Sequence, residues 1–153
     1  MRTIEEYLPQ HPFFAGLDNS VAALVSGCAR NVHFRPGEFL FHEGDAADRF
    51  FVVRHGRVSL EVRAPAGPAV VVDVVQDDDV VGWSWLVPPH RWMFDARSTD
   101  QTSAIVFDAV CLRDKAATDP VVGYALLQRV VTVMADRVQS ARVRLVDLYG
   151  APA

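Results

Sequence analysis

The sequence predicts an α+β fold that is mainly β: an antiparallel double-stranded β-helix, or jelly roll, with short N-terminal helices and a long C-terminal helix. Residues 35–58 carry three glycine turn signals, Pro36-Gly37, Gly44-Asp45 and His55-Gly56, separated by aromatic and β-branched runs too short for helices. Similar runs continue to Phe107, and their regular turn spacing favours closure into a barrel. Beyond them the pattern is helical, and from Asp119-Pro120 to Asp147 nothing breaks the helix.

The length and composition indicate how many domains the chain contains and whether it enters a membrane. A chain of 153 residues with 50% hydrophobic content suits one domain, residues 1–153, made of a helical lead-in (1–30), a β-roll (31–108) and C-terminal helices (109–149). The chain lacks an 18-residue apolar run, and its acidic start lacks a signal-peptide core, so we expect a cytoplasmic protein that does not enter a membrane.

The net charge and the number of cysteines bear on whether the chain binds DNA or a metal ion. A net charge of −4 disfavours DNA binding by this chain alone, because nucleic-acid-binding modules carry a basic face. Cys28 and Cys111 are too few for a four-thiolate metal site within one chain. We expect both to be buried or inert thiols.

The lead-in and the strands follow in order. Asp18 or Asn19 is placed to cap a helix that buries Val21, Leu24 and Val25. The alternating runs after it predict strands at Asn31 to Phe34, Phe39 to Glu43, Phe50 to Val53, Val58 to Arg63, Ala69 to Val75, Met93 to Arg97 and Ser103 to Phe107.

The C-terminal region is helical. Asp108 can cap a helix from Ala109, and Asp119-Pro120 opens a second. Apolar residues in the second helix recur in steps of four and three, which is a heptad spacing. This stripe either lies on the chain's own barrel or forms a parallel seam with a second copy; spacing near 3.5 favours the seam, and we expect a homodimer. The stripe consists of Leu127, Val131, Met134, Val138, Ala141, Leu145 and Leu148.

The roll motif resembles the cyclic-nucleotide-binding domain of the catabolite-activator and FNR superfamily. Its elements appear in order as Pro36-Gly37, Leu40-Phe41, Gly44-Asp45, Phe50-Phe51-Val52 and Gly56-Arg57-Val58, and Phe13-Phe14-Ala15-Gly16-Leu17 fits the helical segment that precedes the roll. The resemblance implies a β-roll, a dimer helix after it, and cAMP or cGMP as ligand, with no other cofactor. A helix-turn-helix would need about 60 further residues, so we expect the DNA-binding half to be missing.

The resemblance places the ligand site between residues 81 and 96. The family's loop offers a glycine, a glutamate for the ribose and an arginine for the phosphate; here Gly82 matches, whereas Trp83 replaces the glutamate and has no acceptor. Counting back from Ala96 puts His90 at the arginine position, with Arg91 beside it. The candidate ligand residues are Gly82, Trp83, Ser84, Trp85, His90, Arg91 and Trp92.

Three functions are compatible with these residues. The first is a non-enzymatic sensor that binds a cyclic nucleotide and signals through its dimer helix to a protein partner. The second is a degenerate pocket in a regulatory or scaffold subunit that contacts its partner through a Trp-rich surface. A remote third is a cupin-like metal-dependent enzyme, which would need His33, His42 or His55 to converge with Glu38 or Glu43.

Overall fold

Two antiparallel sheets face each other and form a β-roll, as the sequence predicts. The computed structural model describes residues 3–150. One sheet has the strand order β1-β8-β3-β6 and the other β2-β7-β4-β5. Apart from β4 and β5, which are consecutive, the neighbours in each sheet come from non-consecutive parts of the chain. The strands are β1 (Ala29–Phe34), β2 (Phe39–Phe41), β3 (Arg49–His55), β4 (Val58–Arg63), β5 (Ala69–Val75), β6 (Val80–Val81), β7 (Asp95–Ser98) and β8 (Thr102–Asp108).

Two of the seven predicted strands, β4 and β5, match at both ends. The predicted strand from Phe39 ends early, at Phe41, because the chain turns at Gly44, whose φ is +89°. The strand predicted from Met93 starts two residues later, because Trp92 pairs instead with the connection between β2 and β3. The two-residue strand β6 was not predicted; it pairs with Phe51 and Val52 of β3.

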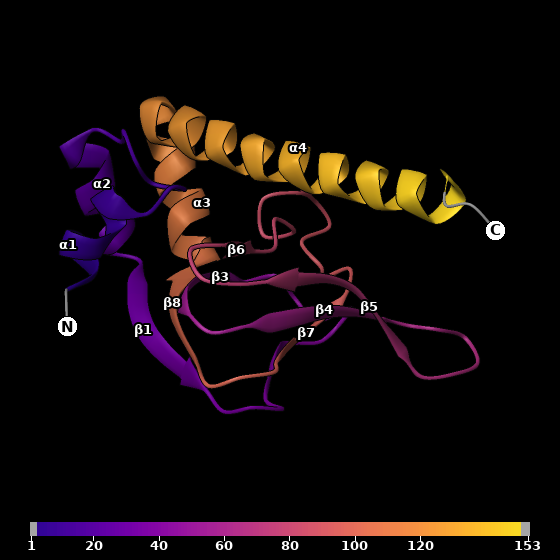
Figure 1. Cartoon of the computed structure of the whole chain (residues 1–153). Helices are drawn as coiled ribbons and strands as arrows, with labels where there is room; N and C mark the ends of the chain where they lie inside the picture. Colours follow the sequence, from indigo (N-terminus) through magenta and orange to yellow (C-terminus); the bar gives the residue numbers. More distant parts are fainter. Residues whose placement is uncertain (1–2, 151–153) are drawn as a thin grey trace.

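The helical lead-in packs against one end of the roll (Figure 1). It contains α1 (Ile4–Tyr7), the 3-10 turn η1 (Leu8–Gln10) and α2 (Asn19–Ser26). The Asp18 carboxylate accepts from the Ser20 amide, which confirms the predicted cap. Val21 and Val25, one helical turn apart, are buried, but the prediction for Leu24 is wrong: it lies beside that face and is 37% exposed.

Two helices follow the roll, α3 (Ala109–Thr118) and α4 (Pro120–Gly150). Asp108 caps α3 by accepting from the Cys111 amide, and Asp119 accepts from the Val121 amide at the start of α4. Helix α4 lies across the roll and its C-terminal half extends beside β5 (Figure 1). Arg137 and Arg144 hold it there: Arg137 pairs with Asp73 of β5 at 2.8 Å, and Arg144 donates to the Val72 carbonyl at 2.6 Å.

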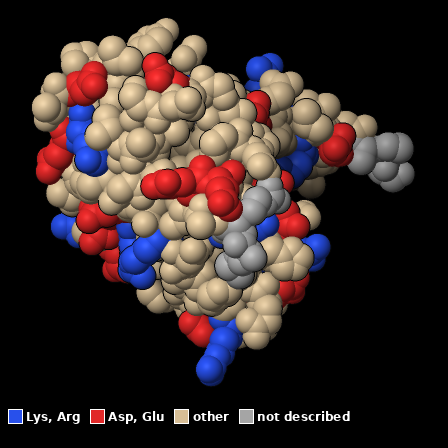
Figure 2. Space-filling view, turned by 90° about the vertical axis from the view of Figure 1, so that its left-hand side faces the viewer, with Lys and Arg blue, Asp and Glu red and all other residues tan. Residues whose placement is uncertain are grey.

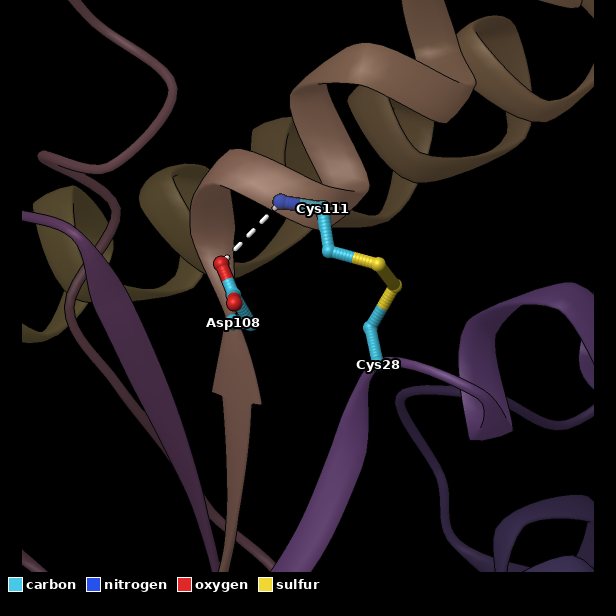
Figure 3. The surroundings of a disulfide bond; sticks show 3 residues. All are labelled: Cys28, Asp108 and Cys111. Carbon is cyan, nitrogen blue, oxygen red and sulfur yellow. Dashed lines mark hydrogen bonds between the residues drawn. A yellow bond between two sulfur atoms is a disulfide. The ribbon is translucent and has the colours of Figure 1, made fainter.

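A disulfide joins Cys28 to Cys111, so the prediction of two separate thiols is wrong. The residues are 83 apart in sequence, with Cα atoms 5.9 Å apart. Cys28 directly precedes β1, and Cys111 lies in the first turn of α3 (Figure 3). Their proximity follows from the antiparallel pairing of β1 with β8, which places Ala29 opposite Phe107.

Candidate functional site

The candidate ligand loop, residues 82–92, connects β6 to β7. It begins at Gly82, whose φ of +86° lies in the left-handed region, and contains a cis peptide between Pro88 and Pro89. Successive turns close it: the Val87 amide donates to Ser84, and the His90 amide to Val87. The loop amides that bond within these turns are not available to a bound anion.

Trp92 fills the space directly above Gly82. Its ring stacks on Phe41 with centroids 3.7 Å apart and planes 7° apart, and it is 1% exposed. A Cβ added at Gly82 would lie 2.2 Å from the Trp92 ring, so only glycine fits beneath the indole. Phe51 and Phe94 lie on the same Phe41 ring at 6.3 and 5.7 Å, which extends the aromatic packing between the two sheets.

The other two tryptophans occupy different surroundings. Trp85 is 1% exposed and stacks on Phe50 with ring centroids 4.7 Å apart, while Arg113 of α3 donates to its carbonyl. Trp83 is half-buried and meets Phe94 edge-on. The alternative of a Trp-rich partner surface is therefore wrong for Trp85 and Trp92, because their apolar rings are packed into the core.

The end of the loop is bonded to the connection between β2 and β3. The Trp92 amide donates to Asp45, and the amides of Gly44 and Ala47 donate to Trp92 and His90 respectively. Arg91 is exposed, and its Nη1 donates to the Gly44 carbonyl at 3.2 Å. His90 is half-buried with a φ of +58°. Ser84 is buried. The loop thus brings Gly82 and Trp92 into contact and ties Arg91 to Gly44.

An ion pair that the sequence did not reveal joins the buried Glu61 of β4 to the partly exposed Arg97 of the adjacent strand β7. Glu61 is 6% exposed; it accepts from Arg97 Nε at 2.9 Å and Nη2 at 3.3 Å, and from the Ser59 hydroxyl at 2.7 Å. This bidentate pairing neutralises Arg97, a cation that would otherwise suit a phosphate. The signal for it was the polar alternation along β4, where Ser59 and Glu61 share one face.

Residues 82–92 line none of three clefts described here on the surface of residues 3–150. One of about 730 Å³ lies between the lead-in, the turn at Asp78-Asp79 and α4. A second of about 650 Å³ surrounds the disulfide, and a third of about 270 Å³ lies beside β1 and β8. The acidic run at 77–79 forms the predicted turn before Val80.

Most of the predicted interface stripe on α4 is exposed, beside the face of the helix that packs against the core. The helix buries Val122, Leu126 and Val130 against the core, whereas Leu127 and Val131, each one position on, are 50% and 53% exposed. Val138, Leu145, Leu148 and Ala141 are exposed as well, and only Met134 of the stripe is partly packed against the core. The interpretation that this stripe covers the chain's own barrel is therefore wrong.

The distribution of charged and metal-ligating side chains can be described for residues 3–150 and for one face of the surface. No group of three or more His, Cys, Asp or Glu within residues 3–150 is placed to hold a metal ion. The histidines have separate neighbours: His33 contacts Ser103, His42 lies 3.7 Å from Asp95, and His55 contacts Asp77. In the face shown in Figure 2, acidic and basic side chains are interspersed among uncharged ones. The helices of the described part include none long and apolar enough to cross a membrane.

Comparison with known proteins identifies the family. Residues 31–119, which contain α3 and all of the roll except the first two residues of β1, match the family described as the cyclic nucleotide-binding domain. The chain belongs to this family. The resemblance drawn from the turn motifs is thereby confirmed.

Relatives of this cyclic nucleotide-binding domain include two regulators from Mycobacterium tuberculosis. The chain is 30% identical over 119 residues to the HTH-type transcriptional regulator Cmr, covering 78% of this chain and 47% of that protein. It is 26% identical over 145 residues to a CRP-like cAMP-activated global transcriptional regulator, covering 95% and 63%. The chain thus spans about half to two thirds of the length of these relatives.

Solved structures share the fold. A putative cyclic nucleotide-binding protein from Geobacter metallireducens superposes with a TM-score of 0.81 at 22% identity, covering 90% of this chain and 99% of that one. The N-terminal domain of a transcriptional regulator from Streptomyces coelicolor gives a TM-score of 0.69 at 27% identity, covering 87% and 93%.

Proposed function

We propose that this domain is a non-enzymatic regulatory module that works as a homodimer joined along α4, with a roll filled by its own aromatic side chains instead of a cyclic nucleotide. The observation that carries the second part is the Trp92 ring, which stacks on Phe41 and occupies the space above Gly82. This is the alternative in which the family fold is kept and the nucleotide pocket is not.

The residues of the loop support this proposal one by one. A cyclic nucleotide needs an acceptor for its ribose, a cation for its phosphate and space for its base. Trp83 stands at the acceptor position, and an indole only donates. Arg91, beside the arginine position, donates to the Gly44 carbonyl, and Arg97 of β7 is paired with Glu61. The stacked rings of Trp92 and Phe41 take up space between the sheets.

The dimer proposal rests on α4. Its stripe of exposed apolar residues runs at heptad spacing, and burying such a stripe against a second copy removes apolar surface from water. The exposed valines of β5, Val70 to Val72, lie beside the C-terminal half of α4 and would enlarge the same patch. We propose that residues 1–153 act as one cytoplasmic domain, with a protein partner and no direct contact with DNA or membrane.

A second candidate is the sensor that binds cAMP or cGMP. It is favoured by the family match and by Gly82, which keeps the family's glycine in a left-handed conformation at the start of the loop. One relative is named as cAMP-activated. Binding in this way would require Trp92 to leave its place on Phe41.

Calorimetry separates the two candidates. We expect no heat when cAMP or cGMP is titrated into the wild-type chain at micromolar concentrations, and none with W83E, which restores a carboxylate but leaves Trp92 in place. Saturable binding to the wild-type chain would refute the filled roll and support the sensor. Binding by W83E alone would show that the missing carboxylate, and not the aromatic filling, prevents nucleotide binding.

A further inference from the structure

The disulfide lies in the wall of a cleft. The second cleft, of about 650 Å³, is lined by Cys28 and Cys111 together with Arg30, Arg49, Asp48 and Asp108, among others. Cys111 is half-buried, whereas Cys28 is 7% exposed. A molecule in this cleft therefore meets the disulfide, and Cys111 is the more accessible of its two residues.

The roll does not depend on this bond for its closure. Strands β1 and β8 pair from Ala29 opposite Phe107 onward, and the Asp108 amide donates to the Cys28 carbonyl at 2.8 Å. What the disulfide adds is a covalent tether from the start of β1 to the first turn of α3 (Figure 3). Breaking it would leave the strands paired and release a constraint on α3.

Helix α3 is connected to both the loop and the long helix. Arg113 donates to the carbonyls of Trp85 and Ala47, so α3 holds the start of the candidate loop. A Cβ added at Gly123 of α4 would lie 2.9 Å from the Ala116 carbonyl, which shows how closely α3 and α4 approach. A change in the freedom of α3 therefore reaches α4 directly.

We propose that the Cys28–Cys111 disulfide is a thiol-exchange site that takes a low-molecular-weight thiol from the cleft and sets the freedom of α3 and α4. This rests on the cytoplasmic location and the α4 dimer proposed above, because in a reducing compartment a disulfide persists chiefly where it is cycled for sensing or catalysis. Arg30 and Arg49 face Asp48 and Asp108 around the cleft, so charge alone selects neither an anionic nor a neutral thiol.

The exchange takes two balanced steps. A thiolate attacks the sulfur of Cys111, the more exposed of the two residues, a mixed disulfide forms, and Cys28 leaves as a thiolate that water protonates. A second thiolate then attacks the small molecule's sulfur and releases the Cys111 thiolate. The amide end of α3 stabilises this leaving group, since Cys111 lies in the helix's first turn. Two small thiols are oxidised to one disulfide, and the protein disulfide is reduced to two thiols.

The exchange can be measured without reference to dimerisation. The chain contains only these two cysteines, so maleimide labelling followed by mass spectrometry counts them without interference. Under native conditions, reduced glutathione and the uncharged 2-mercaptoethanol should each release both thiols. With oxidised glutathione, C28S should form the mixed disulfide at Cys111 about tenfold faster than C111S forms it at Cys28.

Two results would overturn the proposal. If reduced glutathione and 2-mercaptoethanol reduce the wild-type disulfide only in denaturant, the bond is a structural tether and not an exchange site. This measurement uses the wild-type chain, so it does not depend on a variant that folds. If native reduction occurs but hydrogen exchange of α3 and α4 is unchanged, the coupling is refuted. Faster exchange in α3 and α4, with β1 and β8 unchanged, is the expected result, and it can be read in a monomer as well as in a dimer.

Discussion

The loop at 82–92 and helix α4 both carry large apolar side chains, but the fold treats them in opposite ways. Trp85 and Trp92 of the loop are 1% exposed and stack on phenylalanines of the strands. Along α4, the stripe at heptad spacing is mostly exposed, and a neighbouring stripe packs against the core. The two buried tryptophans of the loop pack against residues of the same chain, whereas α4 leaves apolar surface exposed that a second molecule could cover.

This contrast assigns different roles to the two regions. Residues packed as closely as Trp92 and Phe41 maintain the shape of the roll, so changes there should cost stability. Residues exposed on α4 contribute little to the isolated chain, so changes there should alter assembly and leave the fold intact. Substitutions in the loop and substitutions on α4 should therefore separate stability from assembly.

The largest effect is expected from adjacent positions on α4. Val130 is 3% exposed and Val131 is 53% exposed. V130E would bury an unpaired carboxylate and should lower the free energy of unfolding by about 5 kcal/mol, enough to unfold a marginal domain. V131E should stay folded. Circular dichroism during urea unfolding measures the stability of both variants. Equal losses of unfolding free energy in V130E and V131E would show that the two faces of the helix are not distinct.

A slightly smaller loss of unfolding free energy is expected when Trp92 is replaced. Replacing this buried ring with alanine should cost about 4 kcal/mol, because it removes the stack on Phe41 and leaves a cavity. Trp83 is half-buried, so W83A is the matched control and should cost less than half as much. If urea unfolding ranked the two in the reverse order, the aromatic filling would not be what holds the roll.

Gly82 and Gly44 form a second matched pair. Both have positive φ, +86° and +89°, but a Cβ would meet the Trp92 ring at 2.2 Å only at Gly82. G44A should cost about 1 kcal/mol from backbone strain alone, and G82A about 3 kcal/mol, because Trp92 must also shift. Thermal unfolding of the two variants gives the difference. Equal costs would mean that Trp92 moves freely away from Gly82.

The smallest effect concerns pH. Burial lowers the pKa of His11, an effect that Asp78 and Asp79 partly oppose. A histidine with a lowered pKa binds fewer protons when folded than when unfolded. Stability should therefore be complete above pH 6.5, the ordinary value, and fall as pH drops below it. H11Q should flatten this dependence in urea titrations between about pH 7 and pH 5. An unchanged slope would contradict the assignment.

The sequence predicted what local chemistry decides. Turn glycines marked the ends of strands, Asp18 and Asp108 capped their helices, and the heptad spacing separated an exposed stripe on α4 from its buried face. It missed contacts that only the folded chain creates. The Glu61–Arg97 pair spans 36 residues, and the disulfide 83. Nothing near either cysteine in sequence indicates its partner, and the alternation along β4 places Glu61 on one face with Ser59 but does not indicate Arg97 as its partner.

The candidate site shows the same division. Gly82 was recognised from its motif, but the reason for a glycine there is Trp92, which reaches it only because the loop end pairs with residues 44–47. Trp83, Trp85 and Trp92 looked alike in sequence, and three different environments separate them in the fold. Their roles depend on which strand lies beneath each ring, and that is a property of the tertiary structure.

The most direct test of the central claim is the mass of the chain in solution. Sedimentation equilibrium should give a dimer for the wild-type chain and a folded monomer for V131E/V138E, which places two charges in the proposed seam. Q139E, on a third face of α4, is the control and should remain a dimer. A wild-type monomer, or a dimer that survives V131E/V138E, would contradict the account.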